Sequence, residues 1–235
     1  MNDGATQIPL NIVLPPENDF ANFYVTERNR ESVNAIALLA QCETPAVAWL
    51  YGESGSGRTH LLEAACLEAQ HLQHSVVYLP LKDLCASEPD GVLEGLDQMD
   101  LLCLDDVHCL QDSAAWQEAL FHLYNRVQQG QTNLLLSADR APRLCDFDLR
   151  DLASRLNSAL VYRLFALDDT AKAACLTLRA NNAGLQLSAE VCDFILRRGE
   201  RSMGALCQTI KQLDHASLAE QRRLTVPFVK QVLGW

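Results

Sequence analysis

The sequence is short of positive charge. Its 235 residues include 19 Lys and Arg against 30 Asp and Glu, which gives a formal net charge of −11. DNA binding gains affinity when cations neutralise phosphates and release counterions, and an average field of this sign opposes that gain. The composition therefore makes DNA a poor first candidate for a direct partner, because any direct affinity would have to come from a local basic patch.

Long apolar runs, a signal peptide and paired cysteine motifs are also missing. No apolar stretch is long enough to cross a bilayer, so no membrane role is expected. The nine cysteines form no C-x-x-C pair, and no cysteine or carboxylate stands at metal-ligand spacing from the six histidines. These absences argue against a metal cage and favour a cytoplasmic protein with reduced thiols in its core.

A glycine-rich stretch, Gly52-Glu53-Ser54-Gly55-Ser56-Gly57-Arg58-Thr59, follows an apolar run at 46–51 and precedes a helical pattern that begins at His60. Glycines let the backbone curl until several N–H groups point inward, and the next helix adds its positive end. The pattern predicts a phosphate-binding loop, with a glycine-rich turn that holds no ligand as the alternative. The residues expected to bind the nucleotide here are Gly52, Gly55, Ser56, Gly57, Arg58, Thr59 and His60.

One position of this loop departs from the usual pattern, which has lysine where this chain has Arg58. Lysine is a compact charge that reaches between the outer phosphates, whereas a guanidinium is planar and broader. We therefore expect nucleotide binding to survive and the chain's own hydrolysis to be weak or absent.

Polar residues also follow two buried strand patterns. Leu101-Leu102-Cys103-Leu104 runs directly into Asp105 and Asp106, and a later apolar run ends in Ser137-Ala138-Asp139-Arg140. Ligands of open parallel sheets bind beyond the carboxyl ends of the strands. We expect Asp105 and the Thr59 hydroxyl to hold Mg²⁺, unless the two acids merely begin a loop.

Alternation of strands and helices predicts an α/β fold with a parallel five-stranded sheet between helices. The strands are expected at 46–51, 76–81, 101–104, 133–136 and 159–165, with helices at 27–42, 60–69, 113–129 and 149–156 and one short helix near 92–96. From residue 167 the pattern is helical only, with Ser188 as an N-cap. The predicted organisation is a flexible tail at 1–19, an α/β nucleotide-binding domain at 20–166 and a small all-α lid domain at 167–235.

The tail contains one short apolar alternation, Gln7-Ile8-Pro9-Leu10-Asn11-Ile12. Its prolines oppose a central strand, so the segment is either a mobile end without a role or a peptide that docks in another protein's groove.

Taken together, these motifs resemble the AAA+ class of P-loop NTPases and, within it, the bacterial DnaA family. The resemblance covers nearly the whole chain from Phe20 onward, and its segments are Gly57 to Leu62, Asp105-Asp106, Gln117 to His122, Ser137 to Pro142 and Ser154-Arg155-Leu156. Because the chain stops at Trp235, where a DNA-binding helix-turn-helix domain should follow the lid, it is most similar to the Hda family of DnaA homologues that lack that domain.

This resemblance implies roles for particular residues. Gly52 to Thr59 looks like Walker A, Asp105 and Asp106 look like Walker B, and Asp139 looks like sensor 1. Arg155 resembles an arginine finger, with a surface salt bridge to Asp151 or Asp148 as the alternative, and Arg201 resembles the sensor 2 arginine. Gln7, Ile8, Leu10 and Ile12 are similar to the Hda family's motif for the replicase sliding clamp. Phe23 and Tyr24 are expected to shape the pocket for the base.

The implied function is regulation of replication initiation. A nucleotide-bound protein, holding ADP, ATP or another nucleotide with Mg²⁺ and tethered to the DNA-loaded clamp, would promote hydrolysis of ATP held by a DnaA-type initiator and so prevent re-initiation. The alternatives are an autonomous AAA+ ATPase or helicase loader, which turns over its own ATP, and a scaffold in which the nucleotide is purely structural. Whether the chain forms a homodimer or a higher oligomer stays open.

Overall fold

The computed structural model describes residues 14–235, which divide into two compact units. The described part of the first unit comprises residues 14–20 and Glu27–Phe165. The second comprises Ala21–Thr26 and Ala166–Trp235. The clamp-like motif at Gln7 to Ile12 lies outside the described residues.

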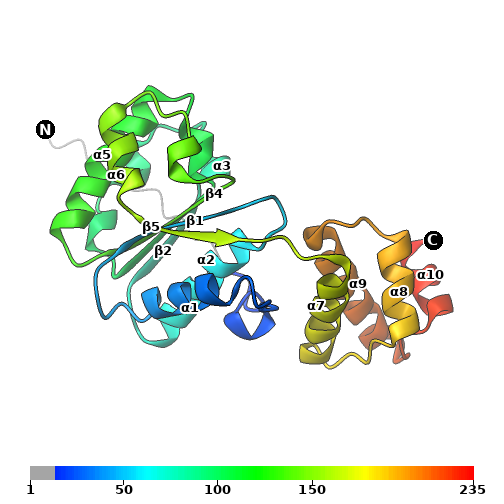
Figure 1. Ribbon diagram of the computed structural model, residues 1–235. Helices are drawn as coiled ribbons and strands as arrows, with labels where there is room; N and C mark the ends of the chain where they lie inside the picture. Colours follow the sequence, from blue (N-terminus) through cyan, green and yellow to red (C-terminus); the bar gives the residue numbers. More distant parts are fainter. Residues whose placement is uncertain (1–13) are drawn as a thin grey trace, which may run out of the picture. The chain divides into compact units, whose positions relative to one another are not determined.

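The first unit is built on a parallel sheet with the strand order β2-β3-β4-β1-β5 (Figure 1). The strands are β1 Val47–Gly52, β2 Val76–Pro80, β3 Leu101–Asp105, β4 Asn133–Ala138 and β5 Leu160–Leu164. Every residue of β3 and β4 is buried, as expected of strands covered on both faces. Because all pairings are parallel, the five carboxyl ends meet at one edge of the sheet, where ligands of such folds bind.

Helices cover both faces of this sheet, with α1 and α2 on one side and α5 and α6 on the other (Figure 1). Their bounds are α1 Arg30–Leu39, α2 Arg58–His71, α5 Ala114–Gln129 and α6 Arg150–Asn157. Shorter helices are α3 Leu81–Leu84 and α4 Asp90–Leu93, and 3-10 turns occur at Phe20–Asn22, Leu96–Gln98, Val107–Leu110 and Pro142–Leu144. The sequence did not predict α3, because four residues are too few to display a helical period. The expected α/β fold is confirmed.

Polar side chains at the start of α1 bind backbone groups at the carboxyl end of β5, which is an edge strand. Asn29 is fully buried, donates from Nδ2 to the Phe165 carbonyl (3.0 Å) and accepts at Oδ1 from the Phe165 amide (2.9 Å). Ser32 Oγ donates to the Arg163 carbonyl at 2.8 Å. An unpaired strand edge invites strand addition, and these contacts satisfy the backbone at one end of that edge.

The second unit is helical and consists of α7 Asp169–Asn182, α8 Ala189–Arg198, α9 Met203–Glu220 and α10 Val226–Leu233. Each helix begins at a capping side chain that accepts a hydrogen bond from a first-turn amide; the caps are Asp168, Ser188, Ser202 and Thr225. The predicted cap at Ser188 is confirmed. Leu176, Ile195, Leu206 and Phe228 belong to this unit's own apolar core.

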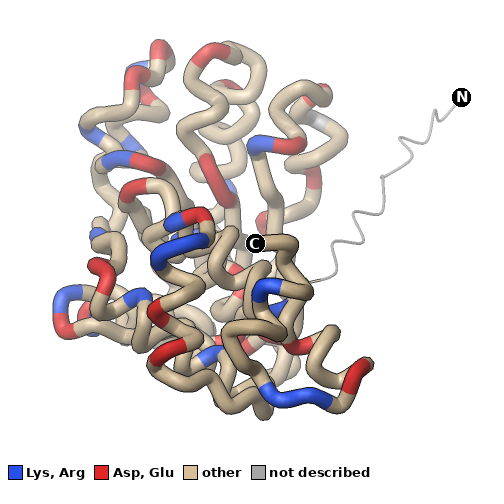
Figure 2. The backbone as a smooth tube through the Cα atoms, turned by 90° about the vertical axis from the view of Figure 1, so that its right-hand side faces the viewer, with Lys and Arg blue, Asp and Glu red and all other residues tan. Residues whose placement is uncertain are grey.

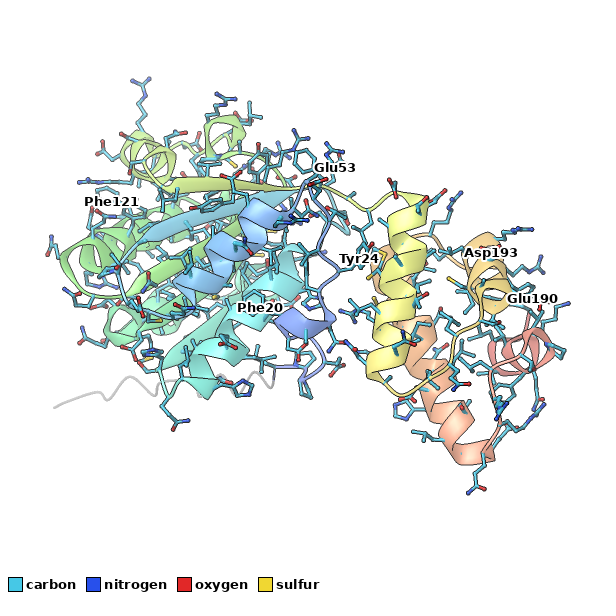
Figure 3. All side chains as sticks on the ribbon, turned by 60° about the horizontal axis from the view of Figure 1, so that its bottom comes forward. Phe20, Tyr24, Glu53, Phe121, Glu190 and Asp193 are labelled. Carbon is cyan, nitrogen blue, oxygen red and sulfur yellow. The ribbon has the colours of Figure 1, made fainter. Side chains whose placement is uncertain are left out.

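Residues 21–26 belong to the helical unit, although the sequence analysis assigned Phe23 and Tyr24 to the α/β domain. Asn182 Nδ2, at the end of α7, donates to the Ala21 carbonyl (3.3 Å) and to Asn22 Oδ1 (3.0 Å). Tyr24 lies beside α7 (Figure 3). Hydrogen bonds between segments so distant in sequence leave no periodic signal.

Three further chemical properties characterise the described part of the chain. All nine cysteines are free thiols. No helix among residues 14–235 is long and apolar enough to span a membrane. Acidic and basic residues are interspersed along the backbone (Figure 2).

Candidate nucleotide-binding site

The glycine-rich loop joins the carboxyl end of β1 to α2, and its backbone requires glycine at three positions. Gly55 and Gly57 have φ angles of 77° and 99°, in the left-handed region that side chains disfavour. A Cβ atom on Gly52 would lie 2.5 Å from the Leu164 carbonyl oxygen and 2.6 Å from Ser56 Oγ. Only glycine lets β1 approach β5 and the loop this closely, so the loop adopts the compact form that a phosphate needs.

Two buried polar atoms of this loop have no hydrogen-bond partner within residues 14–235. They are Ser56 Oγ, on a residue that is 4% exposed, and Arg58 Nη1. Buried polar atoms are seldom left without a partner, so each marks a position where an anionic oxygen could bind. The amides of the first turn of α2 add donors and the positive end of the helix dipole. The loop therefore fits a phosphate group.

The Arg58 guanidinium is held by a carboxylate of the same site. Its Nη2 lies 3.2 Å from Asp106 Oδ1, with the two side chains 13% and 22% exposed. An ion pair this sheltered is screened little by salt. A phosphate that binds Arg58 must therefore compete with Asp106 for the guanidinium.

Asp105 is the most buried carboxylate of the site, at 3% exposed, and accepts hydrogen bonds from three hydroxyl groups. Thr59 Oγ1 donates to Oδ2 at 2.6 Å, Tyr78 Oη donates to Oδ2 at 2.9 Å, and Ser137 Oγ donates to Oδ1. Burial, reinforced by the Asp105 charge, raises the pKa of the Tyr78 hydroxyl far above its ordinary value, so this group stays a donor. The hydroxyls provide the hydrogen bonds that a buried carboxylate needs.

Asp106 follows β3 in a left-handed conformation, with φ 58° and ψ 45°. Its amide donates to Ser137 Oγ at 3.0 Å, and His108 Nδ1 lies 3.9 Å from its Oδ1. Burial and the neighbouring Asp105 charge raise the pKa of Asp106, against the opposing effect of Arg58. A carboxyl whose pKa is raised is a better proton acceptor once ionised.

Asp139, just past the end of β4, is paired with its sequence neighbour. Arg140 donates from Nε to Oδ1 and from Nη2 to Oδ2, each at 2.8 Å. These hydrogen bonds lower the pKa of Asp139, and the charges of His108 and Arg58 act in the same direction. Asp139 therefore shares the electrostatic environment of the loop and of Asp106.

Mg²⁺ prefers oxygen ligands and keeps several waters in protein sites. The described part contains no cluster of three or more His, Cys, Asp or Glu residues that could cage a metal. Thr59 Oγ1 and Asp105 Oδ2, which belong to the two residues expected to hold Mg²⁺, are in direct contact at 2.6 Å. This donor set fits a metal whose remaining ligands come from phosphate and water.

The other predicted residues lie in different surroundings. His60 Nε2 is 2.8 Å from the carbonyl of Asp19, in the segment before α1. Arg155 is exposed in the last turn of α6. Arg201, like Phe23 and Tyr24, belongs to the helical unit, where it precedes α9 and pairs with Asp169.

Sequence reasoning missed three contributors to the site: Tyr78 as a donor to Asp105, Ser137 as the link between Asp105 and Asp106, and His108. A signal existed for the first two, because each is a hydroxyl-bearing residue within a mainly apolar strand. His108 lies within a short 3-10 turn, where no pattern distinguishes it from a surface histidine.

The opposite pKa shifts of Asp106 and Asp139 predict opposite effects of two matched substitutions. Ionisation of Asp106 opposes folding because its pKa is raised in the folded state, so Asp106→Asn should raise the melting temperature at pH 7. Asparagine also tolerates the left-handed backbone. Ionisation of Asp139 favours folding because its pKa is lowered, so Asp139→Asn should reduce the melting temperature at pH 7.

The Asp106 difference from wild type should vanish as the pH falls from the raised pKa of this group to the ordinary aspartate value of 3.8. The Asp139 difference should persist to that value and shrink below it, as the lowered pKa of Asp139 is crossed. These differences in melting temperature can be measured by circular dichroism between about pH 3 and pH 7 at constant ionic strength. Shifts of the same sign at pH 7 would contradict the assigned electrostatics.

Two family models match adjoining parts of the chain. The bacterial DnaA ATPase domain matches residues 14–164, and the Hda lid domain matches residues 169–233.

Several solved structures are also similar. Domain III of the Thermotoga maritima replication initiation protein DnaA has a TM-score of 0.76 and 23% identity, covering 94% of this chain and 98% of that one. AMPPCP-bound DnaA from Aquifex aeolicus has a TM-score of 0.70 and 26% identity, covering 88% of this chain and 68% of that one. The Thermotoga maritima RuvB Holliday junction branch migration motor shares the fold, with a TM-score of 0.67 and 17% identity over 94% of this chain and 72% of that one.

The DnaA match spans more than half of the chain. It ends at residue 164, and the Hda lid match begins at residue 169. The range of the DnaA match contains the glycine-rich loop, Asp105 and Asp106 at the end of β3, and Asp139. The chain therefore belongs to the bacterial DnaA ATPase family, as an AAA+ protein with a lid domain of the Hda type.

Proposed function

We propose that this protein is a nucleotide-bound regulator of replication initiation that stimulates hydrolysis of ATP held by a DnaA-type initiator, and so prevents re-initiation. The observation that carries the proposal is the contrast between two arginines. Arg58, in the chain's own loop, is paired with Asp106 at 3.2 Å. Arg155 is exposed, and its guanidinium has no partner within residues 14–235.

The paired Arg58 supports weak hydrolysis by the chain's own site. Catalysis of phosphoryl transfer depends on cations positioned against the developing charge. A broad guanidinium already engaged by a carboxylate is poorly placed for that role, yet it suits retention of a diphosphate. In this proposal the loop holds ADP or ATP with Mg²⁺ at Thr59 and Asp105, and Asp139 acts as a sensor.

The free Arg155 supports action on a partner. Neither Asp148 nor Asp151, the two acids that could have neutralised it, forms an ion pair with it in the described part of the chain. An exposed, unpaired guanidinium at the end of a short helix can enter a neighbouring protein's site. There it would stabilise charge on the transferring phosphoryl group, as arginine fingers supplied in trans do.

The sliding clamp is the proposed tether, on the basis of the sequence at Gln7, Ile8, Leu10 and Ile12. Contact with DNA would then be indirect, in keeping with the net charge of −11. Binding to the clamp would concentrate the protein on newly replicated DNA, where the clamp is loaded.

A second candidate is an autonomous AAA+ ATPase or helicase loader. The raised pKa of Asp106 favours it, because an ionised carboxyl of this kind is suited to accept a proton from the attacking water.

For the nucleotide, Arg58→Ala should weaken ADP binding much more than Ser54→Ala. The first change removes the only side-chain cation within the loop, whereas Ser54 is exposed and the main chain survives its loss. Titration calorimetry of both variants provides the comparison, and equal affinities would remove Arg58 from the site.

For the tether, the double change Gln7→Ala and Leu10→Ala should abolish binding to purified clamp while melting temperature and ADP affinity stay at wild-type values. Surface plasmon resonance on immobilised clamp reads out the first quantity. Unchanged clamp affinity would mean that the tail does not dock there.

For the finger, Arg155→Ala should lose the stimulation of ATP hydrolysis on the initiator. The hydrolysis rate should fall by up to roughly 10³-fold to 10⁵-fold, which is the contribution typical of arginine fingers. Arg155→Lys should restore little, because one ammonium cannot reproduce the planar fork. Arg150→Ala is the matched control, since Arg150 is also exposed on α6 but lies five residues away, on a different side of the helix.

The readout is phosphate release from ATP-loaded initiator with clamp on DNA, alongside clamp and ADP affinities that should not change. Wild-type stimulation by the Arg155→Ala variant would refute the mechanism in trans. Equal loss in the Arg150→Ala variant would show a general charge effect instead of a finger.

A further inference from the structure

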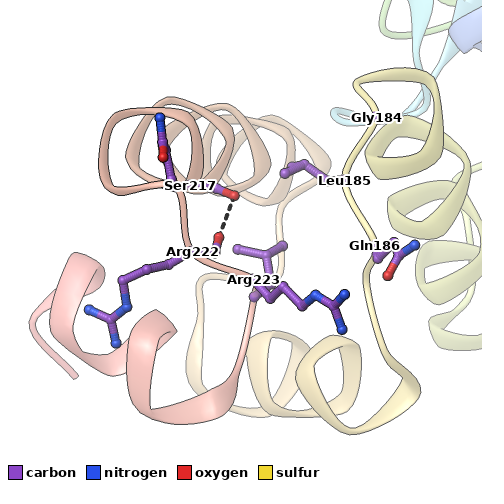
Figure 4. A pocket seen from close by; sticks show the side chains of 8 residues that line it. Gly184, Leu185, Gln186, Ser217, Arg222 and Arg223 are labelled. Atoms are coloured by element: carbon purple, nitrogen blue, oxygen red, sulfur yellow. Dashed lines mark hydrogen bonds between the residues drawn. The ribbon is translucent and has the colours of Figure 1, made fainter.

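The helical unit contains a pocket of about 360 Å³ between the loop that joins α7 to α8 and the loop that joins α9 to α10 (Figure 4). Its lining includes Leu185 and Gln186 from the first loop and Arg223 and Leu224 from the second. This volume lies at the lower end of the range of small-ligand sites. The comparisons and the proposed function assign no role to it.

Hydrogen bonds fix both walls of this pocket. Ser217 Oγ donates to the Arg222 carbonyl at 2.7 Å, and the Arg222 amide donates to the Ser217 carbonyl at 3.2 Å. On the opposite wall, the Leu185 amide donates to the Ala180 carbonyl at 2.8 Å. A site with a preformed backbone spends little binding free energy on ordering its walls.

Two adjacent arginines of the pocket differ in their surroundings. Arg222 Nη1 donates to Glu220 Oε2 and Gln231 Oε1, both at 3.0 Å, and its Cζ lies 4.6 Å from the centre of the Phe228 ring. Arg223 is exposed and has no ion pair or hydrogen bond from its side chain within the described range. Figure 4 shows the Arg223 guanidinium extending toward Gln186, while Arg222 points away from that side of the pocket.

The apolar part of the lining comes from the unit's core. Leu185 is 7% exposed and Leu224 is 8% exposed, and both belong to the same buried cluster. The Arg223 guanidinium and the Gln186 carboxamide thus lie beside a small aliphatic surface formed by Leu185 and Leu224. One guanidinium matches one carboxylate, which it can bind with two parallel hydrogen bonds.

We propose that this pocket binds the carboxylate side chain of an acidic peptide segment, followed by an aliphatic residue, on a partner protein. The carboxylate pairs with Arg223 and accepts from the Gln186 amide, and the aliphatic side chain covers Leu185 and Leu224. A nucleic acid fits less well, because phosphate backbones require several cations and this chain carries a net charge of −11.

The test uses the full-length chain and the blocked dipeptide acetyl-Glu-Leu-amide, with affinity measured by titration calorimetry. Arg223→Gln should weaken binding by about tenfold or more, the usual effect of losing a charge-assisted contact. Arg198→Gln is the matched control, because Arg198 is an exposed arginine of the same unit, and it should change the affinity less than about twofold. Both variants should melt at the wild-type temperature.

Three further ligands separate the sources of binding. Acetyl-Gln-Leu-amide should bind about tenfold more weakly than the acidic dipeptide, and free acetate should bind more weakly still. A short oligothymidylate should not displace the dipeptide. The proposal fails if the dipeptide does not bind at millimolar concentration, if Arg223→Gln leaves its affinity unchanged, if acetate binds as tightly, or if the oligonucleotide competes. These results do not depend on Arg155 or on the initiator.

Discussion

The hydrogen bonding of Asp105 holds the nucleotide site together. This carboxylate is 3% exposed, and its donors come from three different elements: Thr59 from α2, Tyr78 from β2 and Ser137 from β4. A polar group buried without partners is costly, so the three converging hydroxyls each stabilise the arrangement around Asp105. Ser137 also accepts the amide of Asp106, which fixes the second acid in its left-handed conformation. The positions of the loop helix, the central strands and both carboxylates thus depend on one another.

The same arrangement explains which parts of the site could be read from the sequence. The buried strands, the glycine loop and the acids at the end of β3 are local patterns, and each lies where its pattern indicated. Thr59 and Asp105 were expected at one site because both belong to recognisable motifs, although their direct hydrogen bond was not predicted. The pairing of Arg58 with Asp106 was not, since neither residue's local sequence specifies which partner it finds. For a related reason, the sequence analysis placed residues 21–26 in the α/β domain, whereas they belong to the helical unit. Their contacts with Asn182 join segments far apart in the sequence.

These contacts suggest a division of labour between the chain's cations. Arg58 is sheltered and neutralised within the chain's own loop, in a position suited to holding a nucleotide. Arg155 is exposed on α6 and has no side-chain partner among residues 14–235, and the proposed function places it in another protein's site. A protein that has kept the AAA+ architecture but separated these two functions would regulate the hydrolysis of a partner with little turnover of its own.

The most direct test of this account is to follow labelled phosphate from two sources in turn. γ-Labelled ATP is loaded either on the DnaA-type initiator or on this chain, the unlabelled partner and DNA-loaded clamp are added, and single-turnover release is measured. The account predicts rapid release of label from the initiator and retention of label on this chain. Release from this chain's own ATP at the same rate or faster would contradict it, and would identify the protein as an autonomous ATPase.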